Sequence, residues 1–230
     1  MNSLNKLRLV LSGLLFAVLM ASCSLNNPVV TDPTPVASLS FYHACPDGPS
    51  LYILIDDATI NSQLFSFGDF TGYSVSKAGT RAIKFKSSNN LTVLVDTTFT
   101  FSDKSTYSIF AINSLANIKA LLIHDVGALS TVANTMVRFI HLSPDAPAVT
   151  ATLVGASGPF FSGGYKEISD FTEMTPKVYT LEIRAQSGGQ LLLSTSVPTL
   201  PGAYYTVALT GYMTPPANNP NALSAKIIAN

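Results

Sequence analysis

One short motif, H-x-[C/S]-P-D-x-P, occurs twice in the chain and carries the residue types that could do chemistry. It places His43 four residues before Asp47, and His141 four residues before Asp145. An imidazole and a carboxylate at this spacing could contribute to a metal site or act as an acid–base pair. A metal-dependent or acid–base enzyme that uses these residues is therefore one alternative function.

The same motif also has a purely structural interpretation, which we favour. Proline fixes φ at Pro46 and Pro144, the aspartate oxygens can accept backbone N–H bonds, and the second proline begins the next strand. A histidine and one aspartate do not complete a metal site, and no third ligand stands at a diagnostic spacing. The signatures G-x-S-x-G, H-E-x-x-H and C-x-x-C are absent from the sequence. The sequence therefore predicts a protein that is not an enzyme and uses no cofactor or metal.

The N-terminus has the pattern of an export signal that ends at a lipid-modified cysteine. Lys6 and Arg8 precede an apolar run of thirteen residues at 9–21. As a helix this run would be roughly 20 Å long, shorter than the roughly 30 Å hydrocarbon core, so residues 1–22 are predicted to be a signal peptide. The small residues directly before Cys23 resemble the lipobox of bacterial lipoproteins. This resemblance implies that Cys23 is lipidated and that the protein is anchored to a membrane without spanning it.

The residues after the cysteine predict a compartment and a tether. Ser24 stands where the inner-membrane retention signal would place Asp, so resemblance to sorted lipoproteins favours the outer membrane. We expect a cell-envelope protein that faces the periplasm or is exposed on the surface. Residues 23–36 contain three prolines, which is typical of an extended tether.

Charge limits the partners. The chain has thirteen basic and thirteen acidic side chains and a net charge of zero, so it has no electrostatic footprint for nucleic acid. The expected partners are the membrane, through the N-terminal lipid, and a protein or glycan ligand.

A repeat with an offset of 98 residues organises the rest of the chain. The same offset that relates the two motifs also aligns Phe67 with Tyr165, and apolar character follows it where identity is lost. We therefore expect two copies of one domain, at residues 37–125 and 136–230. A linker at residues 126–135 would join them.

Each copy has the pattern of short β-strands, and no window has a convincing helical period. Segments rich in β-branched and aromatic residues alternate with turn-forming residues. In the first copy these segments are 39–43, 51–55, 81–85, 91–95, 106–112 and 118–123. Tyr107 and Tyr205 begin the penultimate predicted strands, as in the tyrosine corner of a sandwich, although an ordinary hairpin would also fit. We expect an all-β fold of two tandem antiparallel β-sandwiches of the immunoglobulin-like kind.

The openings of the two copies resemble a known family. FYHACPDGP at 41–49 and VRFIHLSPDAPAV at 137–149, with FGDFTGY at 67–73 and a later Gly79, are similar to the domain of unknown function 4397. That family consists of exported bacterial proteins, often with tandem copies and often lipid-anchored. The resemblance covers about residues 37–230 and implies export and this fold, and it brings no established activity.

Two loops distinguish the second copy. Its middle loop has Lys166 and Lys177 where the first copy has Gly68 and Gly79, so the pattern predicts a shared shape for this loop less strongly than for the rest of the copy. The loop at 211–221 is several residues longer than its counterpart in the first copy. It could be a binding loop or only a tolerated insertion. The residues that could form a contact patch there are Tyr212, Met213, Pro215 and Pro216.

These observations together predict a non-catalytic, lipid-anchored cell-envelope protein that binds or scaffolds an unidentified ligand. Apart from the enzyme considered above, the alternative is a surface adhesin or glycan-binding lipoprotein. Stacking platforms for sugars usually contain tryptophan, and this chain has none.

Overall fold

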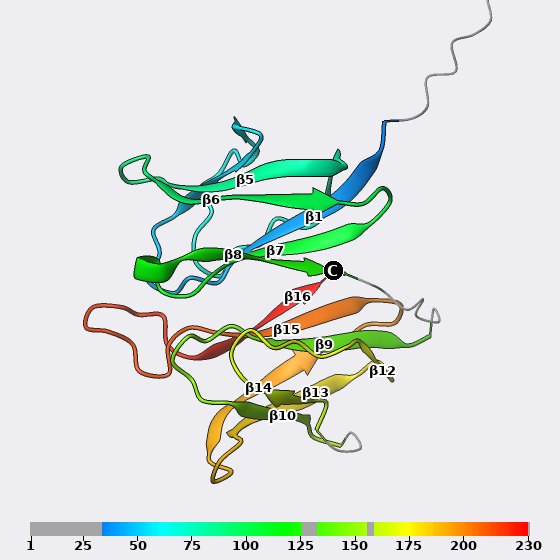
Figure 1. Cartoon of the computed structure of the whole chain (residues 1–230). Helices are drawn as coiled ribbons and strands as arrows, with labels where there is room; N and C mark the ends of the chain where they lie inside the picture. Colours follow the sequence, from blue (N-terminus) through cyan, green and yellow to red (C-terminus); the bar gives the residue numbers. More distant parts are fainter. Residues whose placement is uncertain (1–33, 126–132, 156–158, 230) are drawn as a thin grey trace, which may run out of the picture. The chain divides into compact units, whose positions relative to one another are not determined.

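The alternating segments of the sequence form sixteen β-strands in the part of the chain that the structure describes, which is residues 34–125, 133–155 and 159–229 (Figure 1). The structure is a computed structural model. The predicted signal peptide, the lipidation site Cys23 and most of the predicted tether and linker lie outside the described residues. No helix in the described ranges is long and apolar enough to cross a membrane.

The first half of the described chain contains eight strands and a short 3-10 turn, and they form two four-stranded sheets. The elements are β1 (Val36–His43), β2 (Leu51–Ile55), β3 (Ala58–Thr59), β4 (Ser74–Lys77), β5 (Gly79–Ser87), β6 (Val93–Phe101), β7 (Thr106–Ile112), η1 (Leu115–Asn117) and β8 (Lys119–His124). One sheet has the order β4-β1-β7-β8 and the other has the order β3-β2-β5-β6.

The second half repeats this arrangement. Its strands are β9 (Thr135–His141), β10 (Val149–Leu153), β11 (Phe161–Gly163), β12 (Thr172–Met174), β13 (Val178–Ala185), β14 (Leu191–Pro198), β15 (Tyr204–Thr210) and β16 (Ser224–Ala229). The sheet orders are β12-β9-β15-β16 and β11-β10-β13-β14. The strand register also repeats 98 residues later, since Leu51 pairs with Ser87 and Val149 pairs with Ala185.

Each half is a sandwich whose core lies between its two sheets. In the first half Phe41 meets Phe85 edge to face, with ring centroids 6.4 Å apart, and both side chains are buried. In the second half Phe139 and Ile183 are fully buried in the equivalent cluster. The alternation of apolar and polar residues along each strand supplies these inward-facing side chains.

One strand pair in each half is parallel. β1 runs parallel to β7, from Ser38 opposite Thr106 to His43 opposite Ala111, and β9 runs parallel to β15. The prediction of wholly antiparallel sandwiches was wrong on this point. Alternation in a sequence indicates which face of a strand is buried, but it does not indicate the direction of the neighbouring strand.

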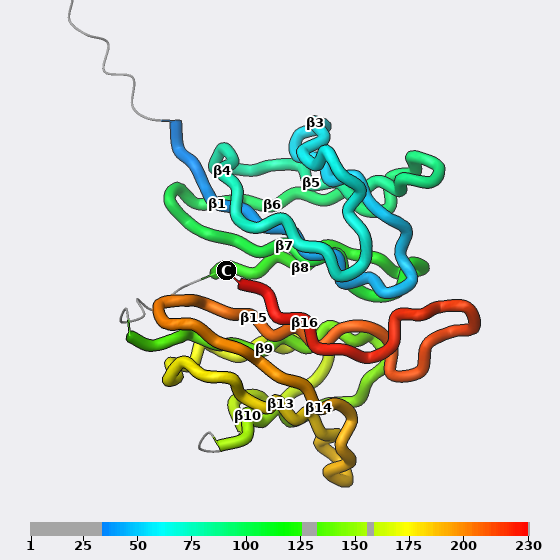
Figure 2. Tube along the Cα trace, turned by 180° about the vertical axis from the view of Figure 1, so that it is seen from behind, coloured from blue at the N-terminus to red at the C-terminus, as the bar shows by residue number. Residues whose placement is uncertain are grey.

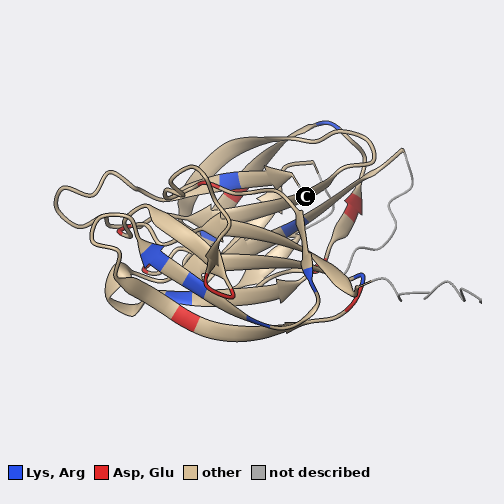
Figure 3. Cartoon of the chain, turned by 90° about the horizontal axis from the view of Figure 1, so that it is seen from above, with Lys and Arg blue, Asp and Glu red and all other residues tan. Residues whose placement is uncertain are grey.

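A third apolar cluster lies between the two halves. It joins the sheet that contains β1 and β7 to the sheet that contains β9 and β15, through Tyr42, Phe110 and Ile112 on one side and Ile140 and Ala208 on the other. These strands are therefore buried on both faces, which explains why β7, β9 and β15 are buried along almost their whole length. Charged residues are mixed in sign along the remaining strands and loops (Figure 3).

Candidate functional site

The first copy of the repeated motif forms a closed turn in which His43 is fully buried. Its Nε2 atom lies 2.9 Å from the carbonyl oxygen of Pro49, which can only accept, so Nε2 carries the hydrogen. Nδ1 then accepts a bond from the backbone N–H of Cys45 at 3.3 Å. Burial lowers the pKa of His43, because the charged imidazolium would lose its hydration. His43 is thus a neutral side chain with both ring nitrogens engaged inside its own turn.

The second copy of the motif repeats this geometry. His141 is fully buried, and its Nε2 donates to the carbonyl of Pro147 at 3.0 Å. Burial lowers its pKa as well. Nδ1 of His141 has no hydrogen-bond partner among the described residues. Pro144 is half-buried in this turn, and its counterpart Pro46 is buried.

The two aspartates of the motif face backbone amides and not the histidines. Asp47 Oδ1 accepts a bond from the N–H of Leu115 at 2.7 Å. The carboxylate of Asp145 accepts from the N–H groups of Met213 and Thr214 at 2.7 and 2.8 Å. Each aspartate therefore ties the turn after the first strand of its half to the connection before the last strand.

The chemistry available at these turns follows from the contacts. Among the described residues, no group of three or more His, Cys, Asp or Glu side chains could hold a metal ion. Burial raises the pKa of the Cys45 thiol to about 12, which keeps it protonated. Neither histidine is thus hydrogen-bonded to the aspartate of its own motif, and these contacts are those of a turn.

The long loop of the second half folds onto the first motif. The side-chain amides of Asn219 and Asn221 both donate to the carbonyl oxygen of Pro46, at 3.1 and 2.6 Å. Tyr212 is only 7% exposed, and burial raises the pKa of its hydroxyl. Tyr212 is therefore not available to the contact patch that the sequence suggested, because its side chain is buried at the start of the loop. Met213 and Pro216 are exposed, and Pro215 is half-buried.

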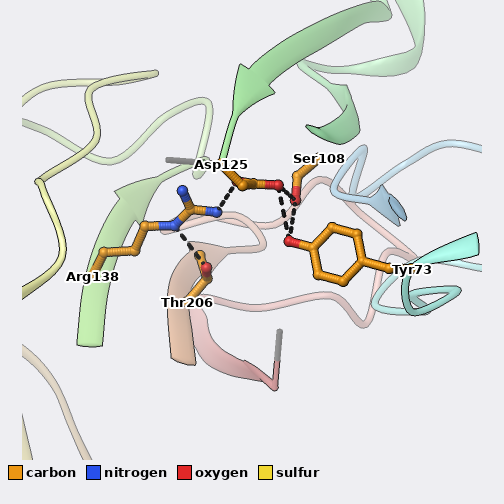
Figure 4. A network of polar contacts seen from close by, with 5 residues as sticks. All are labelled: Tyr73, Ser108, Asp125, Arg138 and Thr206. Carbon is orange, nitrogen blue, oxygen red and sulfur yellow. Dashed lines mark hydrogen bonds and ion pairs between the residues drawn. The ribbon is translucent and has the colours of Figure 1, made fainter. Parts of the chain in front are cut away.

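A buried ion pair forms a second link between the halves (Figure 4). Arg138 binds Asp125, and the two side chains are 4% and 6% exposed. Arg138 Nε also donates to the hydroxyl of Thr206 at 2.8 Å. Asp125 Oδ2 accepts from Ser108 at 2.7 Å and from Tyr73 at 2.9 Å. The sequence analysis did not identify this pair, although Arg138 inside an apolar strand was a signal that a buried partner existed.

Figure 2 shows the course of the segment that joins β3 to β4. A groove with a volume of about 590 Å³ lies beside this segment. Three apolar side chains along it are exposed, namely Ile60 (42%), Leu64 (51%) and Phe70 (40%). Lys226, on β16 of the second half, completes the lining. The groove was missed in the sequence, where the only signal was three apolar residues in a segment without strand alternation.

Much of the polar lining of this groove is engaged in holding its own loop. Asn61 Oδ1 accepts from the N–H of Ile53 at 2.7 Å. The amide nitrogen of Asn61 donates to the carbonyls of Leu51 and Gln63 at 3.0 and 2.7 Å. Asn61 therefore fixes the start of the loop to β2.

The far end of the loop is fixed to the first motif in a similar way. Asp69 Oδ2 accepts from the N–H of Ser66 at 2.8 Å, and its carbonyl accepts from the N–H of His43 at 3.0 Å. The hydroxyl of Thr71 accepts from the N–H of Phe41 at 3.0 Å. The buried turn of His43 thus positions the wall of the groove.

Comparison with known proteins identifies one family. The family model described as Domain of unknown function (DUF4397) matches residues 37–152, which comprise the first half and the first two strands of the second. None of the curated proteins compared with the chain matches it. Among solved structures, the chain is similar to CBMbc (family CBM26) from Eubacterium rectale Amy13K in complex with maltoheptaose. The identity is 10%, the alignment covers 84% of this chain and 96% of that chain, and the TM-score is 0.27.

Proposed function

The chain belongs to the DUF4397 family of domains of unknown function, and from this premise we propose that it is a non-catalytic binding or scaffolding protein of the cell envelope. In this proposal a lipid on Cys23 anchors it to the outer membrane, and two tandem immunoglobulin-like sandwiches form its body. The family description names no activity, so the proposal rests on the residues of this chain.

One contrast within the molecule carries the proposal. The groups that could do chemistry, His43 and His141, are fully buried and bonded within their own turns. The groove beside residues 60–73 is open, and apolar side chains are exposed along it. Exposed apolar clusters on soluble domains commonly mark interaction sites. The molecule therefore offers a surface for binding and keeps its acid–base groups away from solvent.

Site-specific photocrosslinking in intact cells tests this function. A photoreactive phenylalanine analogue at Leu64 should give adducts on irradiation, because the side chain lies at the groove. The same analogue at Val178, which is 67% exposed in the second half, serves as the matched control. Adducts at both positions in equal amount, or at neither, would contradict a binding role for the groove.

The anchor is tested separately by cell fractionation. We expect the chain in the outer-membrane fraction, and we expect Cys23→Ala to release it from that fraction. Protease added to unbroken cells then distinguishes a surface-exposed protein, which is degraded, from one that faces the periplasm. A Cys23→Ala chain that stays with the membrane would exclude the lipid as the anchor.

A further inference from the structure

We propose that the groove beside residues 60–73 binds an extended segment of another protein that carries apolar side chains and an acidic residue. This inference rests on the binding function proposed above and names the chemical class of the ligand. The groove walls, the free edge of β4 and the single lysine of the lining each support it.

The walls of the groove favour apolar ligand groups. Ile60, Leu64 and Phe70 are each about half exposed, and Phe65 forms a buried floor between them and the core. Side chains that an extended peptide places in such a groove lose their contact with water, which is the main driving force of such binding.

Two polar side chains of the lining, those of Asn61 and Thr71, are not free to recognise a sugar. Recognition of a sugar needs side-chain donors and acceptors that are free to face the ligand. Asn61 uses its oxygen and its amide nitrogen within its own loop, and the hydroxyl of Thr71 accepts from Phe41 and donates to Gly72. The exposed polar side chains of Ser62 and Gln63 also line the groove, beside the three exposed apolar groups.

A strand edge runs from the groove. Ser74 lines the groove and begins β4, which is the outermost strand of its sheet. An outermost strand leaves every second pair of backbone groups without a partner strand, and an extended peptide can pair with them.

The register identifies the open position on this edge. The N–H of Ala78 donates to the carbonyl of Pro35. The alternation of an antiparallel ladder therefore points the backbone N–H and C=O groups of Val75 and Lys77 away from β1. The carbonyl of Lys77 accepts a bond from Arg81 Nε at 3.2 Å. No side chain among the described residues binds the outward N–H and C=O groups of Val75. An added strand would form its backbone hydrogen bonds with these two groups.

The charge in the lining comes from both halves. Lys226 is exposed, and it makes no ion pair within the described ranges. Asp69, the acidic residue of the lining, already accepts a bond from the Ser66 amide. An acidic ligand residue placed at the Lys226 end of the groove would complement the lysine. The ligand would then touch both halves, so the site is complete only when the halves are docked.

Selection from a library of random peptides displayed on phage, with the purified full chain as target, tests the proposal. We expect the selected sequences to combine apolar residues with Asp or Glu. Binding of the best synthetic peptide, followed by fluorescence anisotropy, should weaken about tenfold in Leu64→Ser and in Lys226→Glu, since tenfold corresponds to about 1.4 kcal/mol. Val75→Pro should also weaken binding, because it removes an outward N–H at a position where an edge strand tolerates proline.

Matched variants outside the groove keep the test specific. Ile168 lies 98 residues after Phe70, and Lys119 is an exposed lysine on the first half, so Ile168→Ser and Lys119→Glu should bind as the original chain does. Failure to select peptides, or equal affinity in Leu64→Ser, would overturn the proposal. Binding of neutral oligosaccharides that Leu64→Ser abolishes would overturn it in favour of a sugar. Crosslinks at Leu64 without peptide binding would leave the binding function standing and remove only this ligand class.

Discussion

The two segments that follow the buried histidines share one backbone frame and present different surfaces. In the first half the N–H of Gly68 donates to the carbonyl of His43 at 2.9 Å, and in the second half Lys166 does the same to His141 at 2.7 Å. The amide of each histidine in turn donates to the next residue of the segment, Asp69 or Glu167. The buried turn therefore fixes the backbone of both segments alike.

The residues that precede these shared hydrogen bonds differ between the two halves in where their apolar side chains lie. In the second half Phe160 and Phe161 pack on Phe139, with ring centroids 5.8 and 4.7 Å apart, so the apolar groups of this segment face the core. In the first half Ile60 and Leu64 remain exposed beside the groove. The comparison teaches that the repeated motif specifies a scaffold, while the neighbouring residues decide whether that scaffold carries a binding surface.

The largest expected effect concerns a position at which one half has a buried charged side chain and the other half has a serine. Arg138 corresponds to Ser40 in the first half, and Arg138→Ser would leave Asp125 buried without its cation. Removing one partner of a buried pair costs about 3–5 kcal/mol, so unfolding in urea should occur at a clearly lower concentration. Arg184→Met, which breaks an exposed pair with Glu182, should change the midpoint little. Equal shifts of the unfolding midpoint in the two variants would show that the buried pair does not stabilise the contact between the halves.

A smaller loss is expected from Asn61→Ala, which removes three hydrogen bonds that hold the groove loop. At about 1 kcal/mol each, these bonds predict a loss of about 2–3 kcal/mol in the free energy of unfolding. The counterpart in the second half is Pro159, and Pro159→Ala at this exposed position should stay within about 0.5 kcal/mol. Similar losses for both would contradict the view that the two loops are built differently.

The two histidines predict a common pH dependence. Burial lowers the pKa of both His43 and His141, so below their ordinary pKa the unfolded chain binds more protons than the folded chain. Their contribution to stability is full above about pH 6.5 and is lost as the pH falls toward the lowered values. The Tm should therefore fall between pH 7.5 and pH 5.5. The exposed His124 supplies a control, since His124→Gln should keep the same fall. A Tm that does not change with pH would exclude neutral buried histidines.

The smallest effect is expected at the position where the first half has glycine and the second half has lysine. Gly68 has φ of +86° with nothing near its missing side chain, and Lys166 has φ of +72°. Gly68→Ala should cost about 1 kcal/mol through backbone strain alone. Lys166→Ala should cost about 0.5 kcal/mol, because only the contact of the ammonium with the Tyr165 ring is lost. Thermal unfolding of both variants would show whether the two segments are strained to the same degree.

The sequence predicted the strands well where alternation is strong. The segments 51–55 and 106–112 are β2 and β7 with the predicted bounds. The turn-forming residues Asp56 and Asp57 directly follow the predicted segment 51–55, and both have positive φ in the hairpin between β2 and β3. The Tyr107 hydroxyl accepts a bond from the N–H of Ser102 at 3.1 Å, as in a tyrosine corner. Such features depend on residues close together in the chain.

The features that the sequence did not reveal are very short strands and contacts between the two halves. β3, β4, β11 and β12 are two to four residues long and have too little alternation to be recognised. The ion pair joins Asp125 to Arg138 across the two halves, and the groove needs Lys226 beside a loop of the first half. Composition and spacing carry no information about which distant segments meet, so these contacts appeared only in three dimensions.

The contacts of Pro46 also determine when the first motif can complete its hydrogen bonds during synthesis and folding. Its carbonyl oxygen accepts from Asn219 and Asn221, which follow it by 173 and 175 residues. A ribosome that adds about 5–20 residues per second delivers these amides roughly 9–35 seconds after Pro46 has been made. The turn that positions the groove wall must therefore wait until Asn219 and Asn221 have been made before its last hydrogen bonds can form. Contacts of such long sequence separation slow folding, although lengthening a loop adds little to its equilibrium cost. The docking of the two halves is accordingly a late event in the maturation of the chain.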